Sequence, residues 1–129
     1  MRILIIIPAL FVSLFLGTPS YSADFDKGLT AAQNGDFAAA FKEWKPLAEQ
    51  GLAKAQFNLG VMYEYGDGVP QDYKEAVRLY RLAAEQGFAD AQYNLGTYYA
   101  NGTGVVQDFM YAHMWLNIAA SNGSDKGNK

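Results

Sequence analysis

The sequence contains no cysteine and a single histidine, His113. Without cysteine the chain has neither disulfide bonds nor a site for a lipid-modified cysteine, so its stability must come from side-chain packing. A metal site needs several nitrogen or sulfur ligands, and a lone histidine does not supply them. We therefore expect His113 to be a packed or surface residue, and we expect no metal and no cofactor.

Positive charge and catalytic motifs are also scarce. The chain has 10 lysines and arginines against 13 acidic residues, a net charge of −3. Nucleic-acid binding calls for clustered Lys and Arg, so nucleic acid is excluded as a partner. No nucleophile elbow, phosphate loop or dinucleotide fingerprint occurs. Acidic pairs such as Asp67 and Asp72 would need a pocket with shifted pKa values to act in catalysis, and we expect no enzyme.

The N-terminus is typical of a secretory signal peptide. A positive start at Arg2 precedes an apolar run over residues 3–16, which is too short to span a bilayer comfortably. Small residues at Ser20 and Ser22 then predict cleavage before Ala23. The predicted cleavage assigns residues 1–22 to the signal peptide. The mature chain is then expected in the periplasm of a Gram-negative bacterium or outside the cell. We expect no stable membrane insertion after cleavage. The alternative is an uncleaved membrane anchor.

A stretch of 36 residues occurs twice, at 52–87 and again at 88–123, with 16 identical positions. A shorter related unit occupies residues 24–51. A fixed period in this range is typical of a helical solenoid, in which each unit buries its apolar face by stacking on its neighbours. The sequence therefore predicts an all-α domain of three antiparallel helix pairs over residues 23–123, followed by a polar tail at 124–129.

Helix boundaries follow from the apolar periodicity and from turn residues. Asp36, Asp72 and Asp108 precede the second helix of each pair and are predicted to cap it, and Glu75 is predicted to complete a capping box with Asp72. The glycines at 51, 87 and 123 close the units. The predicted helices span residues 24–34, 37–50, 53–65, 73–86, 89–101 and 108–122.

The repeated pattern AxAQxNLGxxYxxGxGVxQDxxxA…AAxxG, at Ala53–Gly87 and Ala89–Gly123, resembles the Sel-one-like repeat (SLR) family, which is related to the tetratricopeptide repeat. The resemblance implies a right-handed superhelix that acts as an interaction scaffold without catalytic activity. The family usually places an aromatic residue three positions after the alanine of the second helix. Trp115 fits that position, Leu79 does not, and in the first unit Trp44 comes one position later.

By analogy with tetratricopeptide repeats, the first helix of each pair lines the concave face. Asn58 and Asn94 are predicted to hydrogen-bond a peptide backbone, with Phe57 and Tyr93 stacking beside them. The alternative is that both asparagines satisfy carbonyl groups within the repeat. The predicted binding residues are Phe57, Asn58, Val61, Glu64, Tyr65, Tyr93, Asn94, Thr97 and Asn101.

These observations predict an exported, non-enzymatic scaffold that binds a protein or peptide partner. Two alternatives are a cell-wall accessory that acts on peptidoglycan and a secreted effector. The last helix has no terminal cap, because the tail after Gly123 is polar, and its exposed side is expected to carry Tyr111, Trp115 and Ile118. The sequence therefore favours self-association through this helix, or a truncated chain, over an isolated monomer.

Overall fold

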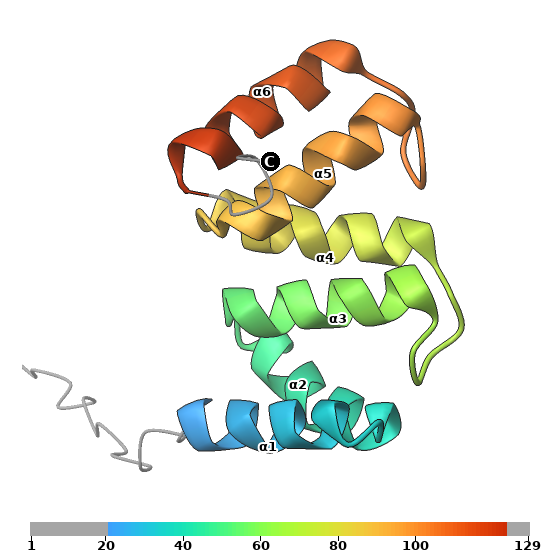
Figure 1. The fold of residues 1–129 in the computed structure, drawn as a ribbon, viewed down its shortest axis with the longest axis vertical. Helices are drawn as coiled ribbons and strands as arrows, with labels where there is room; N and C mark the ends of the chain where they lie inside the picture. The colour runs from blue at the N-terminus through green and yellow to red at the C-terminus, as the bar shows by residue number, and fades with distance from the viewer. Residues whose placement is uncertain (1–20, 124–129) are drawn as a thin grey trace, which may run out of the picture.

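The structure is a computed structural model that describes residues 21–123. Within these residues the chain forms six α-helices and no strand, each helix 13 residues long, which stack from α1 at one end to α6 at the other (Figure 1). Each helix packs on the next one in the chain. The helices are α1 (Tyr21–Gln33), α2 (Phe37–Glu49), α3 (Ala53–Tyr65), α4 (Tyr73–Glu85), α5 (Ala89–Asn101) and α6 (Phe109–Ser121).

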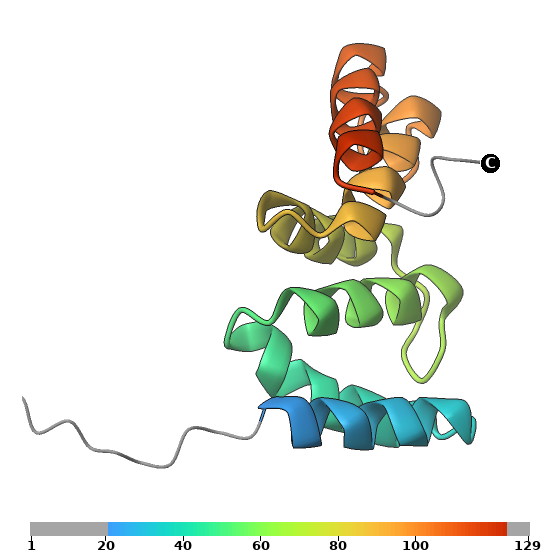
Figure 2. The same cartoon turned by 60° about the vertical axis from the view of Figure 1, so that its left-hand side comes forward.

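The predicted all-α fold of three stacked helix pairs is confirmed. Each helix pair is rotated relative to the one before it, as the turned view shows (Figure 2). The first helix begins at Tyr21, three residues before the predicted start, whereas α3 and α5 match their predicted bounds. The predicted signal peptide lies almost entirely outside the described residues, as does the polar tail. No helix within residues 21–123 is both long enough and apolar enough to cross a membrane.

The three predicted aspartate caps are present. Each side chain accepts a hydrogen bond from the backbone N–H three residues later, as Asp72 does from Glu75 at 3.1 Å. The capping box is wrong, however. The Glu75 carboxylate binds Arg78 instead, and the backbone N–H of Asp72 already donates to the carbonyl of Tyr63 at 2.9 Å. The other two caps are Asp36 to Ala39 and Asp108 to Tyr111.

Within each pair, a large side chain of the second helix fills a gap left by a glycine in the first. A Cβ placed on Gly60 would lie 2.7 Å from the ring of Tyr80, and Tyr80 is fully buried. Glycine in a helix interior costs about 1 kcal/mol relative to alanine, so its recurrence here reflects close helix approach. The same pairing joins Gly28 to Trp44 and Gly96 to Leu116.

Between pairs, a buried glutamine links the first helix of the second and third pairs to the helix before it. Gln56 donates from Nε2 to the carbonyl of Ala48 at 3.2 Å and accepts a hydrogen bond from Gln86 at 2.8 Å. A buried amide needs such partners, because an unsatisfied polar group in the core is costly. One repeat later the same roles are taken by Gln92, Ala84 and Asn122.

Replacing Gly60 with alanine is expected to lower the free energy of unfolding by about 1–3 kcal/mol, because the added methyl group overlaps the Tyr80 ring in a packed interface. Urea denaturation followed by circular dichroism measures the loss. In a Tyr80→Ala background the same substitution should raise stability by up to about 1 kcal/mol, since the helix propensity of alanine is then unopposed. An equal loss in both backgrounds would contradict the explanation.

Candidate functional site

The predicted binding residues lie on α3 and α5, but two of them pack between repeats. The ring of Phe57 lies 5.6 Å from that of Tyr80 and 5.1 Å from that of Phe88, centroid to centroid. Val61 is partly buried against the core cluster that α4 and α5 share. Both side chains therefore contribute to the interface between successive helix pairs.

The two asparagines are half-buried. Asn94 hydrogen-bonds the phenol of the buried Tyr80 in the preceding repeat, which gives this side chain a contact between successive repeats. Beside it, the carbonyl of Tyr93 accepts a hydrogen bond from the Thr97 hydroxyl at 3.1 Å. At the end of α3, by contrast, Tyr65 is 67% exposed.

Glu64 interacts with two buried tyrosines, Tyr80 and Tyr98. The hydroxyl of Tyr80 donates to Oε2 of Glu64. Burial raises the pKa of Tyr80, and its hydrogen bond to Glu64 raises it further. Burial likewise raises the pKa of Tyr98, and the charge of Glu64 adds to the effect. Both phenols therefore stay protonated well above the pH at which a free tyrosine ionises.

A cavity of about 230 Å³ opens beside this cluster. We call it the α3–α5 recess. It brings together Glu64, Thr97 and Asn101, three of the predicted binding residues, which come from the C-terminal halves of α3 and α5. Its polar atoms are carboxylate, amide and hydroxyl groups, which suit hydrogen bonding to a peptide. Tyr73, Tyr98 and Thr103 complete the lining.

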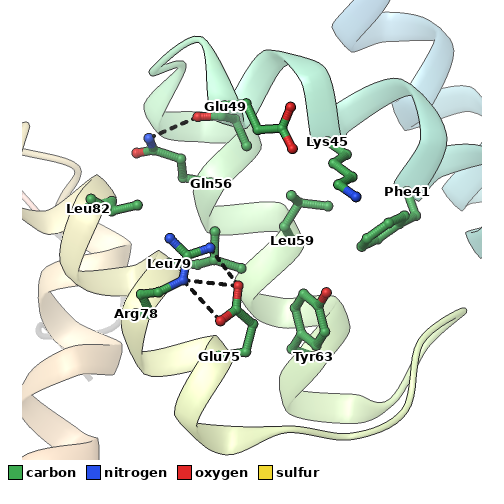
Figure 3. Close-up of a pocket in the computed structure, with 11 residues that line it drawn as sticks. Phe41, Lys45, Glu49, Gln56, Leu59, Tyr63, Glu75, Arg78, Leu79 and Leu82 are labelled. Atoms are coloured by element: carbon green, nitrogen blue, oxygen red, sulfur yellow. Dashed lines mark hydrogen bonds and ion pairs between the residues drawn. The ribbon is translucent and has the colours of Figure 1, made fainter.

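A larger cavity, of about 320 Å³, lies between α2 and α4 with α3 beneath it. We call it the α2–α4 groove. Figure 3 shows side chains from all three helices converging on it. Apolar groups form most of the lining, and charged side chains stand at its edge. The lining residues are Phe41, Lys45, Ala48, Glu49, Gln56, Leu59, Tyr63, Glu75, Arg78, Leu79 and Leu82.

The sequence analysis did not predict this groove. The residues of α3 that line it, Gln56, Leu59 and Tyr63, follow one another at helical spacing and lie opposite Asn58 and Tyr65 on the helix. The sequence did contain a signal, because Leu79 is the residue that departs from the aromatic expected at its place in the repeat.

Charged groups at the edge of the groove come from two helices. On α4, Nε of Arg78 lies 3.0 and 2.9 Å from the two carboxylate oxygens of Glu75, a bidentate pair visible in Figure 3. On α2, Nζ of Lys45 lies 5.9 Å from the centroid of the Phe41 ring. The edge thus carries charges of both signs around an apolar floor.

The outer side of α6 is apolar, as predicted, but its composition differs from the prediction. Tyr111 is exposed, whereas Trp115 and Ile118 are half-buried, and Trp115 packs against the second core cluster. The most exposed apolar side chains are instead Met110, at 85%, and Phe109, at 68%. Both residues lie in the first turn of α6.

His113 is a surface residue, in agreement with the prediction, and its Nδ1 lies 3.1 Å from the amide nitrogen of Asn117. Within residues 21–123 no three His, Cys, Asp or Glu side chains are grouped so that they could hold a metal ion.

The profile of the Sel1 repeat matches residues 53–88 and 89–124, which together make up more than half of the chain. Among solved structures, a Sel1 repeat protein from Oxalobacter formigenes superposes with a TM-score of 0.79 at 34% identity, over 84% of this chain and 46% of that one. A protective antigen of uropathogenic Escherichia coli with an SLR fold gives a TM-score of 0.77 at 39% identity, over 83% and 24% of the two chains.

Helicobacter pylori cysteine rich protein B shares the fold, with a TM-score of 0.67 at 20% identity over 86% of this chain and 96% of that one. A curated relative, DAP3-binding cell death enhancer 1 of Rattus norvegicus, is 40% identical over 50 residues, which are 39% of this chain and 10% of the relative. The chain therefore matches about a tenth of the curated relative and about a quarter to a half of the two more similar solved structures.

The raised pKa of Tyr80 predicts a loss of stability in base. An unfolded tyrosine ionises near pH 10.0, while folded Tyr80 keeps its proton. Its stabilising contribution is therefore complete below pH 10 and falls as the pH rises further, by about 1.4 kcal/mol per pH unit for each such tyrosine. Tyr80→Phe should make the free energy of unfolding fall less steeply with pH above pH 10, because one of the tyrosines that cause the fall is absent. Urea denaturation at pH values on either side of pH 10 measures this dependence. Tyr65→Phe, at an exposed position, is the matched control, and equal slopes in the two variants would contradict the prediction.

Proposed function

Because this chain belongs to the Sel1 repeat family, we propose that it is an exported, non-enzymatic scaffold that binds a peptide or a partner helix. The Sel1 repeat fold commonly mediates protein–protein interaction. A stack of helix pairs offers long continuous surfaces, and such surfaces suit recognition of an extended or helical segment.

One observation supports a particular surface for this role. The α3–α5 recess gathers Glu64, Thr97 and Asn101 from two successive first helices. Its carboxylate is held in place by the hydroxyl of Tyr80, so a ligand would meet an acceptor that is already oriented. We propose that a peptide crosses this recess beside the exposed ring of Tyr65 and hydrogen-bonds the side chains that line it.

Export is the part of the proposal that depends on the N-terminal sequence. The positive start, the apolar run over residues 3–16 and the small residues before Ala23 have the order of a secretory signal. The proposed location is the periplasm of a Gram-negative bacterium or the medium outside it. A scaffold in either place would meet exported proteins.

We also propose that the protein self-associates through α6. Lys74 and Arg78 on α4 are replaced, 36 residues later, by Met110 and Met114 on α6. Both methionines are exposed, and an exposed cluster of flexible apolar side chains favours an interface. The opposite end of the stack carries the ion pair of Asp24 and Lys27. The apolar face of α6 is therefore more complementary to the same face of a second copy than to that charged end.

Peptide binding at the α3–α5 recess predicts site-specific crosslinking. A photoreactive benzoylphenylalanine placed at the exposed position Asn101 should give covalent adducts with exported proteins when the producing cells are irradiated, because the side chain borders the recess. The same residue at Glu85, exposed at the end of α4, is the matched control. Mass spectrometry of the adducts identifies the partner, and adducts of equal yield at both positions would argue against a site at the recess.

Self-association predicts a concentration-dependent mass in light scattering on a size-exclusion column, approaching twice the monomer mass. Met110→Lys combined with Met114→Lys should give a monomer at every concentration, because charge on both faces opposes their contact. Leu29→Lys, at an apolar position on α1 that is exposed to the same degree as Met114, should leave the dimer intact. A wild-type monomer at high concentration would exclude association through α6.

A further inference from the structure

The α2–α4 groove lies at a place where two successive repeats carry different side chains. Leu79 and Trp115 occupy equivalent positions 36 residues apart, as do Glu75 and Tyr111. Trp115 is half-buried against the second core cluster, and the ring of Tyr111 lies 5.0 Å from that of Tyr99, centroid to centroid. Aromatic rings thus occupy, in the third repeat, the place that is open in the second.

The basic residue at the edge differs in the same way. Arg81 stands where Lys45 stands one repeat earlier, and it donates from Nη2 to the hydroxyl of Tyr99 at 2.7 Å. Lys45 lies instead with its Nζ over the ring of Phe41. Arg81 and Tyr111 therefore both contact Tyr99 of the third repeat, whereas a recess of about 320 Å³ lies between α2 and α4.

We propose that the α2–α4 groove binds a tryptophan side chain of a partner protein, flanked in that partner by an acidic and a basic residue. The floor offers Leu59, Tyr63 and Leu79 to the indole (Figure 3). Their equivalents in the following repeat, Leu95, Tyr99 and Trp115, belong to or pack against one core cluster. A volume of about 320 Å³ is at the low end of ligand pockets, which span about 300–1,000 Å³, so it suits one large side chain.

The charges at the edge specify the flanking residues. Within residues 21–123 the ion pairs are Asp24 with Lys27 and Glu75 with Arg78. Lys45 and Glu49 belong to neither pair, and they stand one helical turn apart on α2, at the same edge of the groove. An acidic and a basic residue on either side of the tryptophan complement these two charges.

This site goes beyond the proposed function, because its lining shares no residue with the α3–α5 recess. Gln56, Leu59 and Tyr63 point into the groove, and the period of an α-helix directs residues 58, 61 and 65 the other way. A partner bound at the α3–α5 recess leaves the groove open. Loss of one site therefore does not imply loss of the other.

The test is a titration of the protein, expressed from its full sequence, with the peptide acetyl-Asp-Trp-Lys-amide, followed by nuclear magnetic resonance. The side-chain amide signals of Gln56 and the methyl signals of Leu79 and Leu82 should shift, with a Kd on the order of 1 mM, as expected for burial of one aromatic side chain. Acetyl-Asp-Ala-Lys-amide should cause no such shifts. Equal shifts with both peptides, or shifts confined to other helices, would overturn the proposal.

Leu79→Trp reproduces the third repeat and should weaken binding of the tryptophan peptide at least about tenfold, because its own indole fills the groove. A folded Leu79→Trp variant with an unchanged Kd would refute the site. Lys45→Glu, at an exposed position outside the core, should raise the Kd about threefold, because it reverses one of the two complementary charges. Lys42→Glu, exposed on the same helix and outside the groove, is its control, and equal affinity in these two variants would also count against the site.

Discussion

The fold depends on one recurring contact, in which a large side chain of each second helix enters the space beside a glycine of the first. The ring of Tyr80 lies so close to Gly60 that even a methyl group does not fit between them. Because the two helices approach this closely, the residues on either side are brought into fixed register. The buried amides of Gln56 and Gln92 then join one pair to the next through identical hydrogen bonds. Together these contacts recur along the stack, although the surface residues differ from repeat to repeat.

Because the same helix contacts recur along the stack, residues at equivalent positions of two repeats can be compared directly. Where α4 has Leu79 and Glu75, α6 has Trp115 and Tyr111, and the backbone that carries them is the same. The smaller set lines the α2–α4 groove, and the larger set places two aromatic rings at the equivalent positions of the third repeat. The replacement of Lys74 by Met110 turns a charged surface position into an exposed apolar one in the same way. Each repeat thus supplies a reference against which the next can be compared, and the differences mark the surfaces that a ligand or partner can use.

The period and the turn residues were enough to predict the helices, because every contact within a pair is local in sequence. The capping box was wrong because two local patterns competed. Glu75 fits a capping box, yet Arg78 one turn later offers it a charged partner, and the Asp72 N–H is taken by Tyr63. Phe57 was predicted to face a ligand, but its ring packs between Tyr80 and Phe88. The groove was not predicted because its volume depends on the separation of α2 and α4, which no single repeat encodes.

The two cavities differ in the kind of ligand they favour, and the difference follows from what surrounds them. The α3–α5 recess is bordered by Glu64, whose carboxylate is held by a buried phenol, and an oriented acceptor favours the hydrogen bonds of a peptide. The α2–α4 groove has an apolar floor with charge confined to its edge, and such a site gains most from burial of a ring. Because the two cavities share no lining residue, a small stack of helices carries one surface suited to backbone recognition and another suited to a side chain. Two weak contacts of different chemistry on one partner would act together, since the second forms at the effective concentration that the first creates.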